Sequence, residues 1–275
     1  MSVLPTLRFA VLGSSSDGNA IVIESHSHNQ CTRLLLDCGF SAKELDKRLE
    51  CIGLSANQLN AVLITHEHQD HATGAYRVAK RCRIPLYATH GTLVAAYDDT
   101  HKKSSHPSND WRLFPYLHII TAGTAFTIGS ITLIPITVPH DAQEPVQYRF
   151  ESGTRHLAVV TDLGHASVHL KQSLNGLHAL VLECNHNTDL LEQSKYPASV
   201  KDRISSHWGH LSNKQSAELL TSLDTTHLHS VWCAHLSHTN NTPHLAQQAL
   251  LEAVDFNITQ VYVLDQEKLN CWFTV

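Results

Sequence analysis

The segment 65–71, with the sequence THEHQDH, gathers side chains that can bind metal ions directly after the apolar run Ala61–Ile64. They form the pattern HxHxDH: His66, His68, Asp70 and His71. Because histidine fills only 22 of 275 positions, chance would produce this pattern about 0.007 times in such a chain. A mere surface cluster of histidines is therefore the weaker explanation. Imidazole and carboxylate groups bind zinc, manganese or iron, and no thiolate is present in the pattern to select zinc.

The HxHxDH segment resembles the hallmark of the metallo-β-lactamase superfamily, and the resemblance continues along the chain. Asp37, in LLLDCG, is similar to the family's first-motif aspartate, which supports the metal-binding loop. His140 in VPHD, Asp162 in VVTDLG and His235 in CAHLS are similar to its remaining ligands. Taken alone, each would be an ordinary loop or turn residue. The resemblance implies two metal sites: His66, His68 and His140 for one ion, Asp70, His71 and His235 for the other, with Asp162 shared.

A site of this kind implies hydrolysis. Two divalent ions about 3.5–4 Å apart can lower the pKa of a bridging water and hold both oxygens of an in-line displacement. Asp70 could also orient the hydroxide, so it is a candidate catalytic residue as well as a ligand, and Asp37 is counted with it for its support of the loop. We expect two zinc or manganese ions, and iron would also suit these ligands.

The ligands alone do not decide the substrate, because thioesterases, lactonases and phosphodiesterases of the superfamily share them. His210, in WGHLSN, resembles a histidine that is not a ligand and that phosphodiesterase members place near the leaving group. There it can act as a general acid. As a histidine just before the helix-capping Ser212, it could instead be structural. His210 therefore favours phosphodiester chemistry over ester or thioester chemistry.

Three further segments, LGSSSDGN at 12–19, ECNH at 183–186 and HLSHTNN at 235–241, resemble the YycJ/WalJ branch of the superfamily. This branch is similar to bacterial exonucleases that act 5′ to 3′ on DNA and is related to the PhnP-type cyclic phosphodiesterases. The first segment could also be no more than a tight hairpin. The implied substrate is DNA, with a cyclic phosphodiester, or a thioester or lactone, as the alternatives. Candidate substrate-binding residues are Ser14, Ser15, Asn19, Asn185, His186, Ser237 and Asn241.

Two other classes of protein fit less well. A redox protein of the flavodiiron type would need a carboxylate where this chain has His68. A scaffold without activity would usually have lost ligands, and the set here is complete. The large insertion found in processive nucleases is not present, so the length of the substrate stays open.

The elements that position these residues alternate in a regular way. Short apolar runs predict strands, and capping residues with 3.6-residue periodicity predict helices. The predicted strands are 7–12, 20–24, 33–37, 61–65, 84–88, 125–128, 131–136, 146–151, 156–161, 179–183, 229–233 and 261–264. The predicted helices are 41–53, 75–82, 89–97, 199–205, 212–223 and 243–254. Many strands with helices before, between and after them favour an α/β (α+β) fold, a four-layer αββα sandwich. Residues 1–275 form one domain, in which the polar stretch 98–118 is a candidate lid.

Composition is in accord with a compact hydrolase. Apolar residues make up 42% and charged residues 16% of the chain, which is enough for a core. A net charge of −5 argues against a uniformly basic surface that coats nucleic acid, although a local basic patch remains compatible with it. The seven cysteines are scattered and odd in number, which is typical of reduced cytoplasmic proteins. We expect no export signal and no membrane span, and a homodimer is left open.

Overall fold

The computed structural model describes residues 6–27, 30–103, 114–255, 259–264 and 271–275. Within these ranges the strands form two sheets of seven strands each. The first has the order β14-β1-β2-β3-β4-β5-β6: β1 (Thr6–Gly13), β2 (Ala20–Ser27), β3 (Gln30–Leu36), β4 (Ala61–Leu63), β5 (Leu86–Thr89), β6 (Leu117–Ile120) and β14 (Phe273–Thr274). The second has the order β13-β12-β11-β10-β9-β8-β7: β7 (Phe126–Ile128), β8 (Ile131–Thr137), β9 (Val146–Ser152), β10 (Arg155–Val160), β11 (Ala179–Glu183), β12 (Ser230–Ala234) and β13 (Gln260–Val263).

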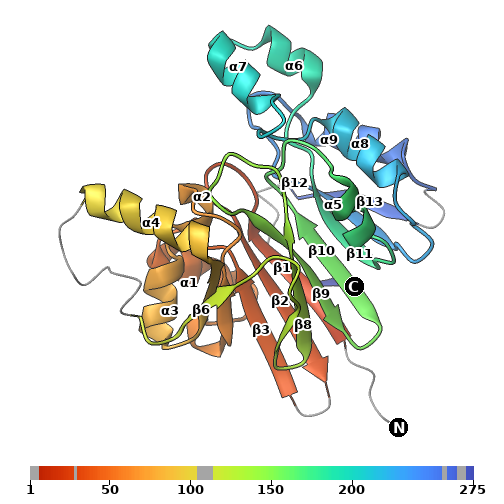
Figure 1. Cartoon of the computed structure of the whole chain (residues 1–275). Coiled ribbons are helices and arrows are strands. Elements are labelled where there is room, and N and C mark those ends of the chain that lie inside the picture. The colour runs from red at the N-terminus through yellow and green to blue at the C-terminus, as the bar shows by residue number, and fades with distance from the viewer. Residues whose placement is uncertain (1–5, 28–29, 104–113, 256–258, 265–270) are drawn as a thin grey trace.

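Helices cover the outer face of each sheet (Figure 1). On the first sheet lie α1 (Ala42–Cys51), α3 (Ala75–Cys82) and α4 (His90–Lys103), and on the second α5 (Val168–Ser173), α8 (Asn213–Thr221) and α9 (Pro243–Leu251). The shorter helices are η1 (Ala56–Gln58), α2 (Gln69–Ala72), α6 (Thr188–Gln193) and α7 (Ala198–Ile204). One apolar core fills the space between the sheets. A second lies between the first sheet and its helices, and a third lies between the second sheet and its helices. The predicted αββα sandwich is confirmed.

Local sequence explains how the strands and helices form. β3 to β6 pair in parallel, as do β10 to β13, and parallel strands buried on both faces need continuous apolar runs such as ALVL in β11. Helix α1 begins where the Ser41 hydroxyl accepts a hydrogen bond from the Glu44 amide, and it buries Leu45 and Leu49. Helix α8 begins with the complete capping box expected at Ser212.

The polar stretch predicted to be irregular at 98–118 is shorter than expected. Helix α4 was predicted to end at Tyr97 but continues to Lys103, because polar residues do not stop a helix and no proline occurs before Pro107. At the other end, β6 begins at Leu117 and pairs with β5. Residues 104–113 lie outside the described residues, so the lid stays a prediction.

The structure also describes the cysteines and the lengths of the apolar helices. All seven cysteines are free thiols. Among the helices that the structure describes, none is both long enough and apolar enough to cross a membrane.

Candidate metal centre

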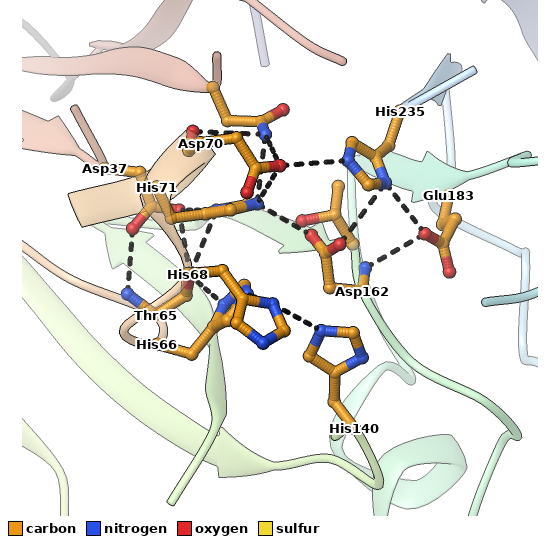
Figure 2. A network of polar contacts seen from close by, with 12 residues as sticks. Asp37, Thr65, His66, His68, Asp70, His71, His140, Asp162, Glu183 and His235 are labelled. Carbon is orange, nitrogen blue, oxygen red and sulfur yellow. Dashed lines mark hydrogen bonds and ion pairs between the residues drawn. The ribbon is translucent and has the colours of Figure 1, made fainter. Parts of the chain in front are cut away.

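The predicted ligands come from both sheets and meet at one end of the sandwich, as Figure 2 shows. The segment 66–71 follows β4 and runs into α2, and His140 follows β8. Asp162 and His235 directly follow the ends of β10 and β12 in the second sheet. Both have a left-handed backbone, with φ of 54°, as does Asp37 after β3, with φ of 58°. This conformation is uncommon for residues other than glycine and turns each side chain out of its strand direction at the end of the sheet.

The first ligand group consists of three histidines whose ring nitrogens converge. His68 Nδ1 lies 3.0 Å from His66 Nε2 and 3.3 Å from His140 Nε2. His140 can donate its Nδ1–H to the Gly209 carbonyl at 3.2 Å, which leaves its Nε2 as a lone-pair donor for a metal. Burial, together with the charges of neighbouring histidines, lowers the pKa of His66, which keeps the ring neutral.

The second group is Asp70, His71 and His235, whose ligand atoms lie within 4.8 Å of one another. Asp162 stands between the two groups. Its Oδ2 is 3.1 Å from His71 Nε2, and its Oδ1 is 3.3 Å from His235 Nδ1. The ligand atoms of Asp162, His66 and His71 also lie within 4.8 Å of one another. Its position is therefore that of a ligand which two ions could share.

The cluster suits divalent cations for two reasons: it consists of imidazole and carboxylate groups, and some of its buried polar atoms lack a hydrogen bond. Among the described residues, Asp162 Oδ2 and His235 Nε2 are buried and make no hydrogen bond of ordinary geometry, although Asp162 Oδ2 lies 3.1 Å from His71 Nε2 and His235 Nε2 lies 3.7 Å from Asp70 Oδ2. Such atoms are costly in a folded protein unless something compensates them. Lone pairs of imidazole and carboxylate that converge in a buried space provide a site of the kind that zinc or manganese occupies.

The electrostatics of the cluster keep its carboxylates charged. Burial alone would raise the pKa of Asp162, but the nearby His235 and His71 hold it well below its ordinary value. Burial would likewise raise the pKa of Asp70, but the nearby His235 and His71, 3.7 Å and 3.4 Å from its Oδ2, lower it instead. Both carboxylates are therefore anionic at neutral pH.

Asp37 supports the loop from behind. Its carboxylate accepts hydrogen bonds from the Thr65 amide at 2.8 Å and from the Thr65 hydroxyl at 2.9 Å. Its Oδ2 also lies 2.9 Å from His71 Nδ1, so His71 can donate that proton and direct its Nε2 into the cluster. Asp37 therefore positions a ligand rather than meeting the metals itself.

His210 lies beside the second ligand group and is held by a residue that the sequence did not single out. Glu183, at the end of β11, accepts from His210 Nδ1 at 2.9 Å and from His235 Nδ1 at 3.0 Å. It also accepts from the amides of Asp162 and Leu211. A charged side chain that ends a strand buried on both faces was the signal that could have identified it. His210 is about one-fifth exposed and keeps its Nε2 for a partner in the cavity.

A cavity of about 560 Å³ opens over these residues. Of the seven predicted substrate-binding residues, Asn185 and Ser237 line it. A larger hollow of about 920 Å³, between β12, β13 and β14, contains none of the candidate ligands. The cavity at the ligand cluster is thus the place where a substrate could meet the metals.

The other five predicted substrate-binding residues lie behind the cavity wall. The Ser14 hydroxyl accepts from the His235 amide at 2.9 Å, and Asn19 Nδ2 lies 3.2 Å from Asp70 Oδ2. Asn241 Nδ2 donates to the Cys184 carbonyl at 2.7 Å. Ser15 and His186 are buried. The contacts of Ser14, Asn19 and Asn241 are those of residues that hold the ligand-bearing segments in place.

Comparison with known proteins agrees with this geometry. The Beta-lactamase superfamily domain matches residues 32–231. The chain is 32% identical over 249 residues to Exodeoxyribonuclease YycJ of Bacillus anthracis, with 90% of this chain and 89% of that protein covered. It is 30% identical to Exodeoxyribonuclease WalJ of Streptococcus pneumoniae, with 89% and 87% covered. A diphosphatase of the PhnP family has the same fold, with a TM-score of 0.66 and 17% identity over 100% of this chain and 98% of that chain.

Proposed function

The chain belongs to the metallo-β-lactamase superfamily, in the branch of the YycJ/WalJ exonucleases, and on this basis we propose that it is a dinuclear phosphodiesterase that degrades DNA from the 5′ end. That it is a metal-dependent hydrolase follows from its family. The number of metals, the DNA substrate and the direction of cleavage are the proposal. The names of the two relatives support a DNA substrate, because both align over nearly the whole chain.

The strongest support for phosphodiester chemistry is the position of His210. It lies on the cavity wall, its Nδ1 can donate a hydrogen bond to Glu183, and its ring lies beside that of the proposed ligand His235. Burial would lower the pKa of His210, but the charge of Glu183 raises it. His210 can therefore carry a proton at neutral pH and donate it to the alkoxide that leaves when a phosphodiester is cut. Thioester hydrolysis has no such need, because a thiolate leaves without protonation.

The other residues have distinct tasks. His66, His68 and His140 would hold one ion and Asp70, His71 and His235 the other, with Asp162 between them; bound there, the ions would supply Lewis-acid activation of the phosphate and of the attacking water. Asp70 provides negative charge at the cavity wall, where it can orient the nucleophile. Asp37 keeps His71 in its tautomer. Asn185 and Ser237 line the cavity and could contact a substrate, although Asn185 Nδ2 already donates to the His235 carbonyl at 3.1 Å.

A cytoplasmic location accords with the free thiols. Cys184 and Cys233 lie side by side in the core as free cysteines. Neighbouring thiols of this kind persist in a reducing compartment.

One panel of substrates tests the proposal. Protein reconstituted with zinc or manganese is assayed on 5′-phosphorylated DNA, on a bis-aryl phosphate, on a cyclic phosphodiester and on a thioester. Release of mononucleotides from the 5′ end, followed with strands labelled at either end, is the expected result. Turnover of the cyclic diester alone would assign a PhnP-type activity, and turnover of the thioester alone would remove the proposal.

A further inference from the structure

The active-site cavity has a single source of fixed positive charge. Among the described residues that line it, Arg203 is the one lysine or arginine. The whole chain carries a net charge of −5, so a polyanion receives no general attraction from it. A substrate with several phosphates would therefore have to be held at this residue and at the metals.

Arg203 is already in contact with an anion beside the ligands. Its Nε donates to Asp141 Oδ2 at 2.6 Å. The other carboxylate oxygen, Asp141 Oδ1, lies 3.5 Å from His140 Nε2 and 3.9 Å from His68 Nε2. Within the described part of the chain, the Nη1 and Nη2 groups of Arg203 make no hydrogen bond. A guanidinium with one N–H occupied and two amino groups open is thus separated from the first ligand group by one carboxylate.

We propose that Arg203 binds the phosphate next to the one that is cut, and that Asp141 occupies the guanidinium in its place until substrate enters. The proposal rests on the proposed function and names a subsite for it. A guanidinium matches the oxygens of a phosphate as it matches those of a carboxylate. The Arg203 side chain is 66% exposed, and exposed pairs contribute little to stability, so Asp141 can be replaced at low cost. A contact to a phosphate positions a strand without reading its bases.

Backbone contacts join the segment of Arg203 to the segment of His210, which lies on the side of the cavity proposed for the leaving group. The His210 amide donates to the Ile204 carbonyl at 2.9 Å, next to Arg203, and the Asp141 amide donates to the Trp208 carbonyl at 2.9 Å. A Cβ atom on Gly209 would collide with the Arg203 carbonyl, so the two segments are in direct backbone contact. Helix α7 buries none of its own residues, and these contacts place its last turn. The backbone at Arg203 is therefore held beside the backbone at His210.

The test separates binding of a neighbouring phosphate from a structural role. Arg203→Ala, Arg203→Lys and Asp141→Asn are compared on a short 5′-phosphorylated DNA strand and on bis(4-nitrophenyl) phosphate, which has no second phosphate. Arg81→Ala is the matched control. Arg81 also forms an exposed ion pair, with an Nη2–Oδ1 distance of 2.7 Å to Asp46, and this pair does not line the cavity. Binding of a phosphorothioate-linked strand is followed by fluorescence anisotropy over a range of salt concentrations, and metal content is measured for each variant.

We expect Arg203→Ala to raise KM for DNA about tenfold or more and to change kcat/KM for the small diester far less. The slope of log affinity against log salt should fall by about 0.7, the value for one phosphate contact with a single strand. Arg203→Lys should restore part of the loss. Asp141→Asn, with its metal retained, should bind DNA more tightly than the wild type.

Two results would overturn the inference: an effect of Arg203→Ala no larger than that of Arg81→Ala, or equal losses on both substrates. If the wild type binds DNA without cutting it, the proposed nuclease activity fails, and the binding data still decide the role of Arg203. If the wild type binds no DNA, the subsite fails as well, whereas turnover of the small diester shows whether the hydrolase is intact.

Discussion

Glu183 Oε1 accepts a hydrogen bond from His210 Nδ1 at 2.9 Å, and the same oxygen lies 3.0 Å from His235 Nδ1. Burial would raise the pKa of Glu183, but the charge and hydrogen bond of His210 lower it to about 2. The carboxylate therefore stays charged and fixes the Nδ1 proton of both rings. Nε2 of each ring is left for the task that we propose for it, metal binding in His235 and proton donation in His210.

The first prediction concerns His210→Ala. A positioned general acid typically contributes a factor of about 10²–10⁴, so kcat on DNA should fall by about that amount. Hydrolysis of a nitrophenyl phosphate ester should be spared, because nitrophenolate leaves without a proton. Steady-state kinetics on the two substrates provide the measurement. Equal losses on both, or loss of a metal ion, would mean that His210 is a ligand or a structural residue.

The second prediction concerns the metal content. Elemental analysis of protein purified under metal-replete conditions should approach two equivalents per chain, and Asp162→Asn should lower the occupancy of both sites. The reason is that Asp162 lies within ligand distance of His66 in the first group and of His71 and His235 in the second. Recovery of at most one equivalent in the wild type would remove the dinuclear assignment.

The third prediction concerns Asp70→Asn. It should abolish turnover and leave the fold intact, because the charge is lost in the short helix α2, outside the apolar cores. Circular dichroism reports the fold, and DNA cleavage reports activity. Activity within about tenfold of the wild type, a change of about 1.4 kcal/mol in the barrier, would exclude the role assigned to Asp70.

The fourth prediction concerns a residue with no side chain. A Cβ atom on Gly39 would collide with the Asp70 carbonyl, whose oxygen already accepts from the Asn19 amide at 2.7 Å. Gly39→Ala should therefore displace the loop, lower the metal content and reduce activity, although no functional group is removed. Metal analysis checks this directly. Full occupancy in a well-folded variant would show that the loop can adjust.

The fifth prediction concerns acid stability and a residue far from the metals. Glu24 is fully buried between Arg8 and Arg33 on the neighbouring strands, with its oxygens 2.5 Å and 2.6 Å from their Nε atoms. Burial alone would raise its pKa, but hydrogen bonds from Arg33, His26 and Arg8 lower it below the ordinary value of 4.5. Its contribution to stability is therefore complete above about pH 4.5 and is lost as the pH falls through the lower pKa of the folded state.

Glu24→Gln tests this by urea unfolding at several pH values. At pH 7 the variant should be about 2 kcal/mol less stable than the wild type, because two buried charged hydrogen bonds are lost. The difference should shrink below pH 4.5. Glu218→Gln, at a position with a 63% exposed side chain, should show neither effect. A difference that stays constant with pH would mean that Glu24 does not titrate as described.

Periodicity and capping residues were sufficient to predict most of the strands and the long helices, because each has a strong local signal. The short elements α2, α5, α6, η1, β6 and β14 were missed, because such short segments carry too little periodicity, and β14 depends on pairing with the distant strand β1. The pairing of Phe273 with Phe9, for example, joins the two ends of the described chain. No local pattern contains such a pairing.

Within the site, the ligands were predicted from a pattern, whereas the supporting residues were not. Glu183 begins the ECNH segment but was not chosen as a site residue, because a carboxylate at the end of the buried run ALVL has no ligand pattern of its own. Ser14 and Asn19 were taken for substrate-binding residues, yet their side chains contact His235 and Asp70. Sequence shows which residue types are present, but the direction of a side chain depends on the three-dimensional structure.

The left-handed backbone at Asp37, Asp162 and His235 bears on how this chain can evolve. An L-residue in this conformation costs about 1 kcal/mol relative to glycine, and His235 lacks the short side chain that makes the conformation tolerable for aspartate. Glycine at these positions would therefore relieve the backbone but would remove the side chains that the proposed site requires. In a library selected for folding alone, glycine or asparagine should replace them, and the descendants should be more heat-resistant and inert.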